Sequence, residues 1–227
     1  MPENKIISID SEKRIREKLI AATGRVMARE GFAHLDRERV SREAGVGAGN
    51  IIRCFGGLEG LVDVYGQSEA FWPSAGELME DAPRDFTKLN PEQQMAAFFK
   101  SLLAALRRRP ETVDILAWEA VERNDYSRRL EEIRVRVSLE YFENLQGEIP
   151  EGTDLSAIVA LLAGAVQFVV ARSHRSSSFG GIALNSEKGW QRIDRAIEAL
   201  MSGSFAASAQ NGTLETSMIS GRSPRSS

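Results

Sequence analysis

The sequence is poor in the residues that build covalent, metal or redox sites. Its 227 residues include one cysteine, Cys54, and two histidines, His34 and His174. A single cysteine excludes a disulfide framework within the chain and favours a reducing compartment, so we expect a cytoplasmic protein. Neither histidine pairs with a cysteine or a carboxylate at metal-ligand spacing, so we expect no metal and no cofactor. No catalytic constellation is evident either, and the protein is not expected to be an enzyme.

Long hydrophobic runs are also scarce. The N-terminal residues, MPENKIISIDSEKR, lack the apolar stretch of a secretory signal. The most apolar segment, residues 155–171, is at the short limit for a membrane span and contains Ser156, Gly164 and Gln167. We interpret it as a buried helix and expect no association with a membrane.

Helical periodicity runs through most of the chain, and no segment is a convincing strand. The sequence therefore predicts an all-α fold, in which a three-helix head with a helix-turn-helix precedes a larger helical domain. Residues 1–10 are expected to be a loose arm, and residues 203–227, rich in Ser and Gly without periodicity, a disordered tail. The expected helices cover residues 11–31, 36–44, 48–55, 58–72, 91–108, 110–123, 126–146, 155–173 and 187–201.

The segment LDRERVSREAGVGAGNIIRCF, residues 35–55, has the pattern of helix, tight turn and helix. Asp36 is a suitable N-cap, and Gly45 is suited to end the first helix in the left-handed conformation. The second helix begins at Gly47 or Ala48, and Asn50 and Arg53 are expected on its exposed face. A short helix with a polar N-terminal end fits the DNA major groove, although an ordinary helical corner has the same local pattern.

The distribution of charge is compatible with a DNA-facing head. The whole chain has a net charge of −3. Residues 1–60 hold 11 Lys and Arg against 9 Asp and Glu, whereas residues 61–227 hold 18 against 23. A mildly basic N-terminal part on an acidic body suits an end that faces phosphates.

Three motifs resemble the tetracycline-repressor-like (TetR) family of transcriptional regulators. They are AATGRVMAREGF, VSREAGVGAGNIIRCF and GGLEGLVDVY, which occur in that order and at that family's spacing within residues 12–66. The resemblance implies a DNA-binding domain at residues 11–57 and a helical ligand-binding and dimerisation domain at residues 58–202. It implies a homodimer on a near-palindromic DNA operator, most simply a repressor released by a small molecule.

The resemblance and the helical pattern together give candidate site residues. For DNA binding they are Lys13, Arg14, Arg37, Arg42, Gly47, Ala48, Gly49, Asn50 and Arg53. For a small, largely apolar effector they are Phe98, Leu102, Trp118 and Tyr141. For the dimer interface, which the family builds from its last two long helices, they are Ile158, Leu162, Val166, Val169, Trp190, Ile193 and Ile197.

Three positions depart from the family pattern. Gly47 stands where a Ser or Thr cap is common, Ile52 where a phosphate-binding Tyr is common, and Leu58 where a phosphate-binding Lys is common. Neither Ile52 nor Leu58 has a side-chain donor for phosphate. A helical protein-interaction module with a vestigial head therefore stays an alternative, as does an all-α enzyme for a small hydrophobic substrate, which would need an ionisable group in its pocket.

Overall fold

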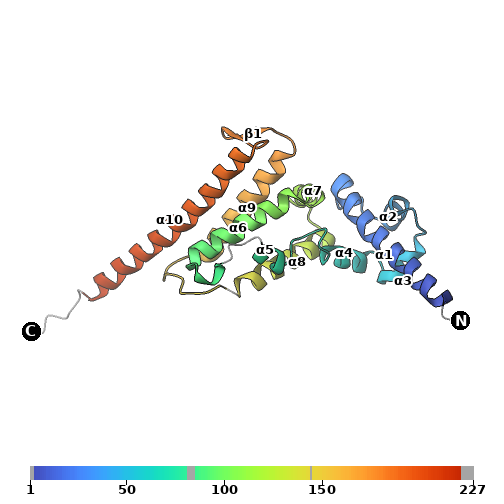
Figure 1. Ribbon diagram of the computed structural model, residues 1–227, viewed down its shortest axis with the longest axis horizontal. Coiled ribbons are helices and arrows are strands. Elements are labelled where there is room, and N and C mark those ends of the chain that lie inside the picture. The colour runs from blue at the N-terminus through green and yellow to red at the C-terminus, as the bar shows by residue number, and fades with distance from the viewer. Residues whose placement is uncertain (1–2, 81–84, 144, 221–227) are drawn as a thin grey trace, which may run out of the picture. The chain divides into compact units, whose positions relative to one another are not determined.

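The computed structural model describes residues 3–80, 85–143 and 145–220, and most of them are helical (Figure 1). The prediction of an all-α fold with an N-terminal helical head and a larger helical part is confirmed. The helices are α1 (Glu3–Glu30), α2 (Arg37–Ala44), α3 (Gly49–Phe55), α4 (Leu58–Gly66), α5 (Ala75–Glu80), the 3-10 helix η1 (Phe86–Lys88), α6 (Pro91–Arg107), α7 (Pro110–Glu119), α8 (Asp125–Phe142), α9 (Leu155–Ser173) and α10 (Glu187–Ser220).

The chain divides into two compact units. The first comprises residues 1–77 and 105–141, and the second comprises residues 78–104 and 142–227. The helix-turn-helix therefore shares a unit with α4, α7 and nearly all of α8. Residues 11–57 do not form a compact unit by themselves. Their role as the DNA-binding region stays a prediction.

In the first unit, apolar residues at helical spacing bury one face of each short helix against α1 and α4. Leu19 and Val26 of α1, Val40 of α2, Ile51 of α3 and Leu61 of α4 are all fully buried. Side chains of that size contribute about 1.5–3 kcal/mol each when they leave water. Burial of one apolar face leaves the opposite faces of α2 and α3 exposed, which orients their polar residues outward.

The end of α1 is held by residues far along the chain. Gly31 has a φ of 77°, and its N–H donates to the Met27 carbonyl at 3.0 Å. The next two backbone N–H groups, of Phe32 and Ala33, donate to one oxygen of Glu122 at 2.7 and 2.9 Å. A Cβ added at Gly31 would lie 2.9 Å from both Glu122 oxygens. Glycine is required here both by the backbone conformation and by the close approach of Glu122.

In the second unit, the buried faces of α6, α9 and α10 supply the core. The Phe98 ring lies 5.0 Å from the Phe99 ring and 4.8 Å from the Phe142 ring, centroid to centroid. The buried Gln94 amide donates to the Leu89 and Gln146 carbonyls and accepts the Gln146 N–H. Because Gln94 uses both ends of its amide, this polar group is accommodated in the apolar interior.

Several boundaries differ from those expected. Helix α1 starts at Glu3, so residues 3–10 are helical rather than a loose arm. Helix α4 stops at Gly66 instead of continuing to Trp72. Glycine is required at this last position, because an added Cβ would lie 2.4 Å from Ile133 of α8. A hairpin of β1 (Ser178–Phe179) and β2 (Ile182–Ala183), which the sequence did not predict, connects α9 to α10.

The disordered tail is corrected as far as Ser220, where α10 ends. Phe205 continues the buried stripe of Met201, and Ser204 and Ser208 donate their hydroxyls to carbonyls one turn earlier. Serine hydroxyls bound in this way lie within the helix instead of competing with it. Residues 221–227 of the expected tail lie outside the described residues.

Replacing Gly31 with Ala tests the contact at the end of α1. Gly45 also has a positive φ, of 66°, but an added Cβ there meets nothing within 4 Å. We expect Gly45→Ala to lower the free energy of unfolding by about 1–2 kcal/mol, the cost of left-handed backbone. Gly31→Ala should cost roughly 1–3 kcal/mol more, because Glu122 must also move. Urea unfolding followed by circular dichroism measures both, and equal losses would contradict the contact.

Candidate nucleic-acid interface

Helices α2 and α3 form the helix-turn-helix expected from the sequence. The Asp36 side chain caps α2 by accepting the Arg39 N–H at 2.7 Å. Gly45 ends α2 in the left-handed conformation, and its N–H donates to the Arg42 carbonyl at 3.3 Å. Helix α3 has no side-chain cap at Ala48, and it ends at Gly56, which has a φ of 76°. Helix α3 therefore begins after small residues and without a capping side chain, which leaves its N-terminal end sterically open.

The two predicted base-reading side chains are bonded to each other. Arg53 donates from Nη2 to Asn50 Oδ1 at 2.8 Å, and Asn50 donates from Nδ2 to the Gly47 carbonyl at 3.0 Å. Arg53 also lies 3.3 Å from Glu12 of α1 and keeps half of its side chain exposed. Gly47 and Gly49 are exposed beside them, and Ala48 is half-buried. The structure thus gathers these predicted residues at one end of α3.

The other predicted DNA contacts are basic side chains on α1 and α2. The predicted contacts Lys13 and Arg14 of α1 and Arg37 and Arg42 of α2 are all exposed. Among the residues that the structure describes, none of these four side chains has a hydrogen bond or ion pair. Unpaired guanidinium and ammonium groups remain available for phosphate, which is what most protein–DNA contacts engage.

Other arginines of α1 hold the helix-turn-helix in place. Arg16 donates to the Cys54 carbonyl and lies 4.4 Å above the Phe55 ring. Arg25 and Arg29 both bind Glu43 of α2, at 2.7 and 3.1 Å. These hydrogen bonds hold the pKa of the Glu43 carboxyl below its usual range. The sequence pattern did not single out these residues, because only Arg25 and Arg29 are one turn apart on the same face of α1 and Arg16 lies nine residues before Arg25.

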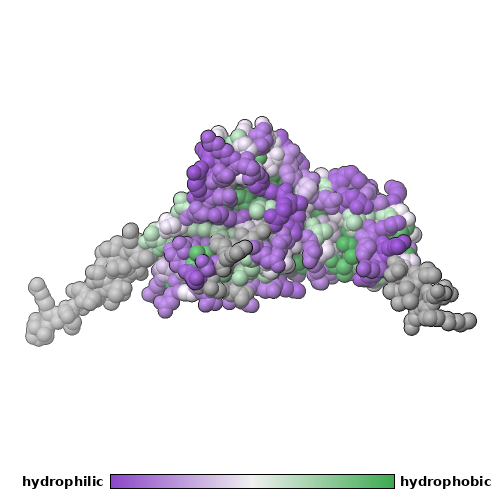
Figure 2. Space-filling view, in the orientation of Figure 1, coloured by the Kyte–Doolittle hydropathy of each residue, from purple (hydrophilic) through white to green (hydrophobic). Residues whose placement is uncertain are grey.

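Hydrophobic side chains stand at two of the departures from the family pattern. Ile52 of α3 is 53% exposed, and Leu58 at the start of α4 is half-buried. Figure 2 shows hydrophobic surface over α4 in the first unit. A half-buried Leu58 has packing neighbours, so this position does not present a freely extended side chain as a surface lysine would.

The four residues predicted for the effector pocket do not gather in one unit. Trp118 and Tyr141 belong to the first unit, and Phe98 and Leu102 belong to the second. Trp118 lies against α1 and donates its indole N–H to the Ala28 carbonyl at 3.0 Å. Burial raises the pKa of the Tyr141 hydroxyl. A shared pocket for these four residues stays a prediction, and Trp118 has a separate role in binding α1.

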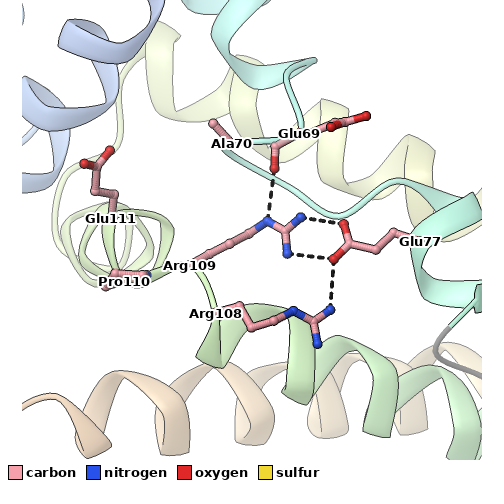
Figure 3. A pocket seen from close by; sticks show the side chains of 7 residues that line it. All are labelled: Glu69, Ala70, Glu77, Arg108, Arg109, Pro110 and Glu111. Atoms are coloured by element: carbon pink, nitrogen blue, oxygen red, sulfur yellow. Dashed lines mark hydrogen bonds and ion pairs between the residues drawn. The ribbon is translucent and has the colours of Figure 1, made fainter.

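A polar pocket of about 420 Å³ lies in the first unit, around the start of α7 (Figure 3). Arg109 turns its guanidinium toward Glu77 and binds both carboxylate oxygens, at 2.9 and 2.5 Å. Arg108 binds the same carboxylate at 3.0 Å, and Arg109 also donates to the Glu69 carbonyl. These bonds occupy the basic groups that line the pocket, so its charge is already compensated.

The residues predicted for the dimer interface are partly buried inside the protomer. Leu162, Val166, Trp190 and Ile197 are at most 8% exposed. This part of the prediction is corrected, because helical spacing identified an apolar face that packs within the chain. Ile158, Val169 and Ile193 remain half-buried. The large apolar side chains that reach solvent on α9 and α10 are instead Leu161, Phe168 and Leu200, which are 75%, 55% and 57% exposed.

Most of α9 is uncovered in the single chain. By length and composition it is apolar enough to cross a membrane, and only 17% of its most hydrophobic window is buried. The interpretation of this segment as a helix is confirmed. What covers the rest of its apolar surface stays a prediction, because the single chain buries only part of it.

Comparison with solved structures identifies the fold. No protein-family model matches the chain, and no curated protein matches it. A TetR-like transcriptional regulator from Rhodococcus sp. RHA1 superimposes with a TM-score of 0.57 at 16% identity, over 85% of this chain and 96% of that one. FadR from Bacillus subtilis in complex with stearoyl-CoA also gives 0.57 at 16% identity, over 82% and 96%.

A third neighbour has the same arrangement. NalD, the secondary repressor of the MexAB-OprM multidrug efflux pump in Pseudomonas aeruginosa, gives a TM-score of 0.56 at 16% identity, over 86% of this chain and 96% of that one. The chain thus has the fold of TetR-family regulators, as its sequence motifs implied. At these identities the likeness establishes the fold, and function must be argued from the site.

The Glu77 ion pairs predict a specific dependence of stability on pH. Hydrogen bonds from Arg109 and then Arg108 hold the pKa of the Glu77 carboxyl below its usual range, against the opposing effect of burial. The carboxylate therefore stabilises the fold above the usual glutamate pKa of about 4.3, and this contribution is lost as the pH falls through the lower pKa of the folded state.

We expect Glu77→Gln to lower the free energy of unfolding at neutral pH and to converge with the wild type in acid. Urea unfolding at a series of pH values measures the difference. Glu69→Gln is the control, because Glu69 lines the same pocket but accepts only through its backbone carbonyl. A Glu77→Gln difference that is independent of pH would contradict the assignment.

Proposed function

We propose that this protein is a transcriptional regulator that binds DNA through α3. The observation that carries the proposal is the hydrogen-bonded pair of a half-exposed Asn50 and an exposed Arg53 on α3, whose N-terminal end is sterically open. Asn bonds adenine at two positions, and Arg bonds guanine at two positions or holds a phosphate. The shared fold with TetR-family regulators supports this reading, and cytoplasmic action follows from it.

The unpaired cations on α1 and α2 hold the DNA backbone in this proposal. Lys13, Arg14, Arg37 and Arg42 replace the phosphate contacts that Ile52 and Leu58 cannot make. Ile52 is exposed on the same helix as Asn50, and an apolar side chain in the major groove contacts the methyl group of thymine. Affinity then comes mainly from the flanks of the recognition helix, and sequence preference comes from its centre.

The partner of the uncovered α9 face is a second copy of the chain. Leu161, Phe168 and Leu200 expose apolar surface of the kind that soluble proteins cover by association. The half-buried Ile158, Val169 and Ile193 complete that surface. A two-fold dimer presents two α3 helices to the DNA, about 34–36 Å apart or a multiple of that distance, and so requires a near-palindromic operator.

The proposed regulator responds to a small molecule and acts as a repressor released from its operator on binding. The stearoyl-CoA complex of FadR is a ligand-bound example of this fold. In this chain, Trp118 of α7 binds α1, and Glu122, just after α7, binds the two backbone N–H groups that follow Gly31. A ligand that shifts α7 therefore acts directly on α1, against which the helix-turn-helix packs. For this response, the ligand must bind more tightly when α7 is in the shifted position than when it is in the original one.

Replacing Asn50 or Arg53 with Ala tests the base contacts. On an operator obtained by selection from genomic fragments, each replacement should weaken binding by about 1–3 kcal/mol. Fluorescence anisotropy with the purified chain measures the affinity. Arg175→Ala, an exposed arginine of the second unit, is the matched control and should bind like the wild type. Unchanged affinity in both folded variants would favour the alternative of an interaction module with a vestigial head.

Leu161→Glu tests the dimer. Leu161 is 75% exposed, so a charge there costs the fold little but opposes an apolar interface. We expect the wild type to sediment as a dimer at micromolar concentration and the variant as a monomer with unchanged helicity and lost operator binding. Leu139→Glu on α8, where Leu139 is 56% exposed, should stay dimeric. A monomeric wild type, or a variant that still dimerises, would refute the interface.

A further inference from the structure

A buried polar cluster in the first unit is not explained by the DNA-binding site. It consists of Trp72, Glu119 of α7 and Arg134 of α8, and we call it the Trp72 cluster. Trp72 is 5% exposed, and the side chains of Glu119 and Arg134 are 8% and 11% exposed. Arg134 Nη2 donates to Glu119 Oε1 at 2.5 Å, and the Arg134 guanidinium carbon lies 5.5 Å from the Trp72 ring centroid. Arg134 thus brings the three side chains together.

Each member of the cluster has a buried polar atom with no hydrogen-bond partner among the described residues. These atoms are two donors, Trp72 Nε1 and Arg134 Nη1, and one acceptor, Glu119 Oε2. An unsatisfied buried group costs about 1–3 kcal/mol, and more when it is charged. Such groups are rare in native proteins, and three of them around one ion pair make this cluster the strongest candidate for binding a polar group among the described residues.

The geometry of the ion pair supports a binding role over a purely structural one. Arg109 and Glu77, in the same unit, pair both guanidinium nitrogens with both carboxylate oxygens. Arg134 uses one nitrogen on Glu119 Oε1, and Arg123 approaches that same oxygen at 3.8 Å. Both arginines therefore approach Glu119 Oε1. Glu119 Oε2 stays available for a ligand, together with the donors Trp72 Nε1 and Arg134 Nη1.

We propose that the Trp72 cluster binds a neutral group that both donates and accepts hydrogen bonds, namely a hydroxyl or a primary carboxamide. Such a group accepts from Trp72 Nε1 and Arg134 Nη1 and donates to Glu119 Oε2. A carboxylate would face Glu119 Oε2 with no proton between them, and an ammonium would face Arg134. The effector is then an apolar molecule with one polar anchor, rather than a wholly apolar one.

The position of Glu119 at the end of α7 links the cluster to the DNA-binding elements, a consequence that rests on the proposed function. Glu119 lies between Trp118, which donates to the Ala28 carbonyl, and Glu122, which accepts from Phe32 and Ala33. A group that binds Glu119 Oε2 acts on the segment that holds the end of α1. Ligand binding and operator binding are then coupled through these contacts.

Four probes with one phenyl ring test the chemistry of the site. They are benzamide, benzyl alcohol, benzoate and toluene, and they differ in the group attached to the ring. The full chain has three tryptophans, so a ¹⁵N correlation spectrum gives three indole signals, assigned by Trp→Phe replacement. We expect benzamide and benzyl alcohol to shift the Trp72 indole signal at millimolar concentration. Toluene and benzoate should leave it in place.

Variants separate the cluster from the rest of the unit. Glu119→Gln should weaken benzamide binding about tenfold, because a charged acceptor is lost. Glu77→Gln changes another arginine-paired glutamate of the same unit and should leave the titration unchanged. The probe series on the wild type tests the proposal even if Glu119→Gln fails to fold. The proposal would be overturned if toluene shifted the Trp72 indole signal as much as benzamide does. It would also be overturned if no probe shifted the signal, since the cluster then holds only water.

Operator binding without probes is measured separately. Benzamide binding with no binding to any DNA fragment would support the cluster and defeat the proposed function. Operator binding with no benzamide or benzyl alcohol response would defeat the cluster and leave the proposed function standing.

Discussion

The contact between the C-terminal region of α7, including Glu122 just after it, and the C-terminal region of α1 is the constraint on which the DNA-binding end depends. The Glu122 carboxylate takes the two backbone N–H groups that follow Gly31, and the Trp118 indole takes the Ala28 carbonyl. Both contacts join residues about 90 positions apart in the chain. Hydrogen bonds to a charged acceptor are stronger than neutral ones, so the direction in which the chain leaves α1 is fixed by α7.

From α1, the position of the recognition helix follows through arginines. Arg25 and Arg29 bind Glu43 on α2, and Arg16 binds the Cys54 carbonyl and the Phe55 ring on α3. These pairs are partly exposed, so each contributes little alone. Together with the buried Val40 and Ile51 they make α1, α2 and α3 one body. A displacement of α7 therefore moves the recognition helix with α1 instead of bending the turn between α2 and α3.

The sequence predicts local structure well here, because its signals are local. Asp36 and Gly45 mark the ends of α2, and both act in the structure as their chemistry requires. The 3.6-residue period identifies apolar faces but not what covers them, so it assigned Val166 to a partner although that residue packs within the chain, and it missed the exposed Leu161. Glu122 and Arg134 act through tertiary neighbours, and nothing in their sequence surroundings distinguishes them from surface charges.

Affinity cleavage tests most directly whether the two α3 helices of a dimer bind the operator. An iron chelate is attached at Gly49→Cys in a Cys54→Ser chain, because Cys54 is the single native thiol. Gly49 is exposed and an added side chain there meets nothing within 4 Å. We expect two clusters of cuts on the operator, about one helical turn apart or a multiple of it. Cleavage spread evenly along the DNA, or equally strong from a chelate at Gly180→Cys on the hairpin, would contradict it.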